Sequence, residues 1–124
     1  MEADAGQAVH EQSRESSGRL RLARVAHDAA LGVPGVLNTD AGPLGLRVTA
    51  AAGQRVPGVV CAASGEDGYE VSLSLIAELV PLPQLGDRVA AAVRHAASAA
   101  GVPLGRVLVN FVGVLGSEDG DANA

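Results

Sequence analysis

Hydrophobic and polar positions follow different spacings along this chain, and each spacing indicates a different kind of element. The clearest pattern covers residues 70–79, where Val71, Leu73 and Leu75 alternate with glutamate and serine. Successive side chains of a strand point to opposite faces, so a period of two is typical of a half-buried strand. We therefore expect a strand here, with one face in the core and most of the other face in water.

Two longer segments have apolar positions at helical spacing. The first covers residues 22–33, and Pro34 ends it because proline cannot continue a helix. The second covers residues 84–100, and Gly101 suits the left-handed residue that closes many helices. The predicted buried stripe of the second helix consists of Leu85, Val89, Val93, Ala96 and Ala100.

Shorter apolar runs predict further strands. Residues 18–22 alternate between polar and apolar side chains and predict a short strand that leads into the first helix. Residues 46–50 alternate in the same way, and residues 59–62 form a continuous apolar run. The Asp67-Gly68 pair that follows this run favours a hairpin turn into the next strand.

The last apolar segment, residues 106–115, is hydrophobic on both of its predicted faces, and only Asn110 interrupts it. Such a strand is either central in a sheet with both faces covered or part of a contact between subunits. Alternation places Val107, Val109 and Phe111 on one face and Leu108, Val112 and Val114 on the other.

Together these elements follow the order β-α-β-β-α-β, a split βαβ arrangement with two helices packed on one face of a sheet. We predict a single small α+β domain over residues 18–116, because a chain of 124 residues leaves little room for a second core. Residues 1–17 and 117–124 are rich in alanine, glycine, serine and acidic residues and have no apolar period. This composition predicts disordered tails.

Composition and charge narrow the expected partners. Hydrophobic residues make up 48% of the chain but aromatic residues only 2%. The core therefore consists of small side chains that bury little area, and contact with a second subunit would bury more apolar area and add stability. This favours a homo-oligomer. The formal net charge of −5 argues against binding to nucleic acid and against adsorption to an anionic membrane. No apolar segment approaches the roughly 18 residues of a spanning helix, so we expect no direct membrane insertion.

Cellular location follows from two further observations. Residues 1–17 lack the cationic start and apolar run of a secretory signal. The single cysteine, Cys61, excludes an intrachain disulfide and suits a reducing compartment. We therefore expect a cytoplasmic protein that reaches a membrane only through a partner.

No arrangement of residues indicates catalysis or metal binding. Cys61 lies inside an apolar run and is expected to behave as a small buried hydrophobe. His27 and His95 lie on the polar faces of the two predicted helices, without metal-ligand spacing. The carboxylate pairs at residues 66–67 and 118–119 fall in a turn and a tail, not in the dry pocket that acid–base catalysis needs. We expect a non-enzymatic protein with no cofactor and no bound metal.

Several short motifs, taken in order, resemble one protein family. Residues 22–36 give a helix that ends in the turn VPGV, and residues 69–79 give a strand. Residues 87–93 and 101–112 give a second helix and a closing strand. In this order and spacing they are similar to the bacterial alkaline shock, or envelope stress response, family. The resemblance implies a cytoplasmic, non-enzymatic protein of cell-envelope homeostasis. In that family some members are held at the membrane by a small membrane-protein partner, and some self-associate. The resemblance therefore implies that this chain has a protein partner, such as a small membrane protein, or binds copies of itself.

We therefore expect a scaffold or adaptor of the bacterial envelope stress response that acts through contacts with a protein partner, such as a small membrane protein, and through self-association. An alternative stays open, because the ferredoxin-like topology also suits a regulatory domain that binds a small molecule between paired copies. The candidate interaction surface consists of Val107, Val109, Phe111, Val112, Val114, Arg24 and His27.

Overall fold

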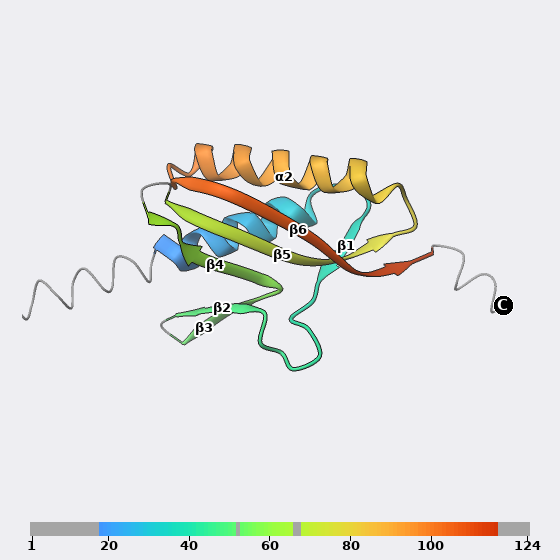
Figure 1. Cartoon of the computed structure of the whole chain (residues 1–124), viewed down its shortest axis with the longest axis horizontal. Helices are drawn as coiled ribbons and strands as arrows, with labels where there is room; N and C mark the ends of the chain where they lie inside the picture. The colour runs from blue at the N-terminus through green and yellow to red at the C-terminus, as the bar shows by residue number, and fades with distance from the viewer. Residues whose placement is uncertain (1–17, 52, 66–67, 117–124) are drawn as a thin grey trace, which may run out of the picture.

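The computed structural model describes residues 18–51, 53–65 and 68–116 (Figure 1). Within these residues a first helix covers residues 18–31, and the second helix is α2 (Leu82–Ala99). The strands are β1 (Val36–Thr39), β2 (Val48–Ala51), β3 (Gln54–Pro57), β4 (Val59–Ala63), β5 (Tyr69–Glu78) and β6 (Leu104–Leu115). The predicted α+β class is confirmed. The predicted tails, residues 1–17 and 117–124, lie outside the described residues.

The central strand of the main sheet is β5. Strand β6 pairs with it in parallel along one edge, and α2 makes the crossover that a parallel pair requires (Figure 1). The other edge of β5 is shared by two short antiparallel strands, with β4 along residues 69–73 and β1 along residues 75–77. Both edges of β5 are therefore paired, whereas the outer edge of β6 has no partner strand within the described residues.

Strands β1 and β4 meet end to end at Ser74. The backbone N–H of Ser74 donates to the Gly58 carbonyl at 2.8 Å, and its carbonyl accepts from the Asp40 N–H at 2.9 Å. Gly58 has a φ of +78°, and a Cβ at this position would lie 2.6 Å from the Thr39 Cβ. Glycine is needed at this junction because it has no Cβ and adopts positive φ at little cost.

Both helices pack on the same face of the sheet. The buried hydrophobic residues form one cluster that includes Leu22 of the first helix, Leu73 of β5 and Val89 of α2. This cluster confirms the prediction that two helices lie on one face. The largest fully buried side chains are Leu22, Leu73, Leu75, Leu85, Val59, Val71, Val89 and Val93.

The hairpin formed by β2 and β3 is a separate two-stranded sheet that lies beside β4 (Figure 1). Thr49 of β2 makes the connection. Its hydroxyl donates to the Val59 carbonyl at 2.8 Å and accepts from the Cys61 N–H at 3.0 Å. One side chain thereby satisfies two backbone groups on the outer edge of β4, where a further strand would otherwise pair.

The predicted strand at residues 18–22 is wrong, because these residues belong to the first helix. Five alternating residues fit either element. Leu22 and Ala23 are fully buried, and they belong to the buried face of the helix, which continues to Ala30. Strands β1 and β3 were not predicted. The described chain therefore begins with a helix, and its order differs from β-α-β-β-α-β.

The predicted stripe of α2 is confirmed at Leu85, Val89 and Val93, which are fully buried. The fourth buried position is Ala97, not Ala96, because the stripe continues at a spacing of four residues. Gly101 has a φ of +71° directly after the helix, as its role in the C-cap predicts.

Candidate interaction surface

The two faces of β6 have different environments. Val107, Val109 and Phe111 are half-buried and pack against the core on the helix side of the sheet. Gly86 of α2 lies close to the Phe111 ring, since a Cβ there would be 3.6 Å from Phe111 Cε2. These three candidate residues therefore contribute to the core, and only the opposite face and the outer edge of β6 are left for contacts with other molecules.

Val112 and Val114 are exposed to 44% and 39%, but they do not share a face. The register between β6 and β5 shifts after Phe111, and beyond the shift Val114 aligns with Ala77, whose side chain is buried on the helix side. Val112 remains on the opposite face with Leu108. The irregularity in the strand thus separates two residues that simple alternation places together.

The sheet face opposite the helices carries exposed apolar side chains from two strands that flank β5. Val60 of β4 aligns with Ser72 of β5, and Ser72 aligns with Leu108 of β6. We call this surface the open sheet face. It consists of Val60, Ser72, Ser74, Leu108, Asn110 and Val112, with Arg47 beside them.

A shallow depression on the open sheet face has polar groups between apolar side chains. Arg47 comes from the segment before β2, and its Nη1 donates to the Ser74 Oγ at 3.2 Å. The Asn110 Nδ2 donates to the Ser72 Oγ at 3.4 Å. A guanidinium has five N–H donors, and none of the described carboxylates forms an ion pair with Arg47. The depression therefore combines a cation and two hydroxyls with the flanking side chain of Val112.

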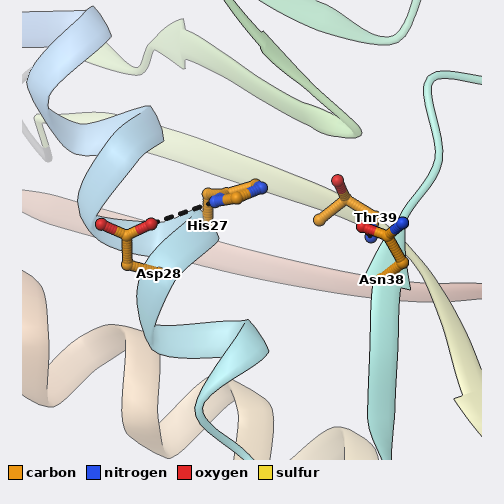
Figure 2. Close-up of polar contacts among 4 residues, drawn as sticks. All are labelled: His27, Asp28, Asn38 and Thr39. Carbon is orange, nitrogen blue, oxygen red and sulfur yellow. Dashed lines mark hydrogen bonds and ion pairs between the residues drawn. The ribbon is translucent and has the colours of Figure 1, made fainter.

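Arg24 and His27 lie on the first helix, away from the open sheet face. Figure 2 shows the His27 ring extending from the helix toward the end of β1, where Asn38 and Thr39 lie. The His27 Nδ1 is 3.1 Å from the Asp28 Oδ1, but the Asp28 side chain is 83% exposed. Because water screens such an exposed contact, it contributes little stability. The structure therefore does not bring Arg24 and His27 together with the candidate residues of β6.

Cys61 is buried in β4, as predicted. Burial raises the pKa of its thiol to about 11, although contact with the Thr49 side chain and the charge of Arg19 lower this pKa. The thiolate is the nucleophilic form, so this side chain is unreactive near neutral pH. In the part of the chain that the structure describes, no group of three or more His, Cys, Asp or Glu residues is placed to hold a metal ion.

Comparison with family models, with curated proteins and with solved structures finds no match for this chain. The resemblance to the alkaline shock family therefore remains a prediction from the sequence motifs. Neither of the described helices is long and apolar enough to cross a membrane.

Sequence reasoning did not include Arg47, Ser72, Ser74 and Val60 among the candidate residues. The serines could have been found from the alternation of residues 70–79, because they occupy the face opposite the buried leucines. Arg47 carries no such signal. It reaches the sheet only because the chain between β1 and β4 folds back beside β5, with the Gly58 N–H donating to the Arg47 carbonyl at 2.7 Å.

Proposed function

We propose that this protein is a non-enzymatic adaptor that binds a segment of a protein partner on its open sheet face. The observation that carries this proposal is the exposure of Val60, Leu108 and Val112 around the guanidinium of Arg47. Contiguous exposed apolar side chains with a polar centre are typical of an interaction site, because covering them removes apolar area from water.

The chemistry of the open sheet face indicates the chemistry of its partner. Val60 and Val112 favour apolar side chains on either side of the bound segment. Arg47 favours a carboxylate between them, because a guanidinium binds a carboxylate with two parallel hydrogen bonds. Ser72 and Asn110 offer further polar contacts. We therefore infer an amphipathic segment that has an acidic residue on its apolar face.

The resemblance to the envelope stress response family supports a more specific proposal. In this reading the chain is a cytoplasmic scaffold of the bacterial cell envelope, and the bound segment belongs to the cytoplasmic part of a small membrane protein. The net charge of −5 favours recruitment through such a partner over direct attraction to anionic lipids.

The test is a comparison of affinity captures from gently detergent-solubilised cells with matched variants. Val112→Asp places a charge on the open sheet face, and Leu37→Asp is its control because both side chains are 44% exposed. We expect one membrane protein in stable ratio with the wild type and with Leu37→Asp, and its loss with Val112→Asp. A synthetic peptide of its cytoplasmic segment should then bind the purified wild type directly.

Charge reversal provides a second control for the same surface. Arg47→Glu should abolish binding of the acidic peptide, whereas Arg88→Glu, a change to an exposed residue of α2, should leave binding unchanged. Capture that is equal for Val112→Asp and Leu37→Asp, or a peptide that does not bind the wild type, would rule out the open sheet face as the docking site.

A second candidate function is the sensing of a small molecule. The depression lined by Arg47, Ser72, Ser74 and Asn110 favours a small carboxylate, because it offers one cation and several hydrogen-bonding groups. A ligand that binds only the native state stabilises it by about 2.7 kcal/mol at a concentration of 100 Kd. A screen of carboxylate metabolites should then raise the Tm of the wild type but not of Arg47→Glu. A screen with no shift would eliminate this alternative.

A further inference from the structure

The outer edge of β6 is a long unpaired strand edge. Strand β6 has 12 residues and pairs only with β5 within the described residues. Natural proteins usually protect such an edge with proline, lysine or inward-pointing charges, because it can pair with another chain. Between Leu104 and Leu115 the only charged side chain is that of Arg106, and there is no proline.

Helix α2 places a charged stripe beside this edge. The Arg94 Nη1 donates to the Gly105 carbonyl of β6 at 2.9 Å, and Arg94 and Ser98 line a small hollow with Leu104. Asp87 lies seven residues before Arg94, which is almost two full helical turns of about 3.6 residues each, so the two side chains lie on the same stripe of the helix. The exposed stripe therefore has the acidic Asp87 toward its N-terminal end and the basic Arg94 toward its C-terminal end.

The positions of these groups fit a twofold axis. Gly86 lies beside Phe111, and Arg94 lies beside Gly105, so α2 runs antiparallel to β6. The midpoint between Asp87 and Arg94 is consequently close to the middle of β6, near Leu108. A twofold axis at this point therefore places β6 antiparallel to its copy and, at the same time, α2 antiparallel to its copy.

We propose that a second copy of this chain pairs antiparallel with the outer edge of β6, so that Asp87 of each copy faces Arg94 of the other. The unpaired backbone groups of the two strands then bond to each other, and the two sheets become continuous. Charge complementarity selects the second copy as the occupant, because a twofold axis brings the acidic end of one stripe to the basic end of its equivalent. The open sheet face stays accessible, so this proposal is independent of the adaptor function.

The first test measures the mass of the full chain in solution by light scattering and sedimentation. The wild type should be a dimer. Asp87→Arg and Arg94→Asp should each weaken the dimer at least tenfold, because each change brings like charges together. The variant that carries both changes should recover most of the affinity between the two copies, because the charges are again opposite. Arg88→Asp, at an exposed position outside the stripe, is the control and should not alter the mass.

The second test locates the interface by cross-linking in a Cys61→Ala background. Leu108→Cys lies near the proposed axis and should form a disulfide between copies under mild oxidation. Val60→Cys is the matched control, since Val60 and Leu108 are exposed to 37% and 38%, but Val60 lies on β4, away from the edge. A monomeric wild type, single variants that dimerise normally, or cross-linking through Val60→Cys in place of Leu108→Cys would overturn the proposal.

Discussion

Replacement of Thr49 by valine tests how the edge of β4 is stabilised. The two side chains have nearly the same shape, but valine cannot hydrogen bond. The Val59 carbonyl and the Cys61 N–H, both in buried residues, would lose their partner. Each buried group left without a partner costs about 1–3 kcal/mol, and the added methyl group returns about 0.8 kcal/mol. We therefore expect Thr49→Val to lower the free energy of unfolding by about 1–5 kcal/mol, with a central value of about 3 kcal/mol.

Thr49→Ser is the control because it keeps the hydroxyl and removes one methyl group, at a cost of about 1 kcal/mol. The measurement is urea unfolding followed by circular dichroism, with similar m-values required for all proteins. In thermal unfolding a loss of about 3 kcal/mol should lower the Tm of the valine variant by about 12–24 °C, since 1 kcal/mol corresponds to about 4–8 °C in a small domain. A valine variant as stable as the serine variant would show that the hydroxyl of Thr49 does not support β4.

Three further predictions test other parts of the structure. Gly58→Ala should cost more than about 2 kcal/mol in urea unfolding, whereas Gly53→Ala should cost about 1 kcal/mol, because φ is positive at both glycines but only Gly58 has close neighbours. The raised pKa of Cys61 predicts a contribution to stability that is complete below pH 9 and is lost as pH rises toward about 11, because the unfolded thiol ionises first. Unfolding measured across this range should show the loss, and Cys61→Ala should remove it; a parallel decline in both proteins would contradict the assignment. Phe111→Ser should lower the Tm by at least about 8 °C and Val112→Ser by less than about 4 °C, since only Phe111 packs on the core. Equal shifts would refute the placement of the two faces of β6.

The elements that sequence reasoning predicted well have a pattern that tertiary contacts reinforce. The alternation at residues 70–79 became β5, which is buried along one face, and the helical spacing from Leu85 became α2. The strand prediction for residues 18–22 was wrong because five residues fit both the strand period and the helix period. The helix is favoured because it packs Leu22 into the core. Strand β1 was missed because it is only four residues long and owes its conformation to pairing with β5.

The candidate surface was predictable only in part, for a related reason. The sequence indicated that β6 has two apolar faces, and alternation divided its residues between them. Alternation could not show which face the helices cover, nor the register shift that turns Val114 to the helix side. It also could not bring Arg47 to Ser74, because this contact depends on the path of the chain between two strands that share one edge of β5.

Local patterns of residues were enough to predict the class of the domain, the two helices and the longest strands, because these depend on periodic burial of side chains within one segment. The composition also determined the small, almost non-aromatic core and the acidic charge. Three further features come from the folded structure alone: which face of β6 is exposed, the lack of a partner strand at its outer edge among the described residues, and the position of Arg47 beside the open sheet face. These features depend on register and on contacts between distant segments, and no local pattern of residues encodes them.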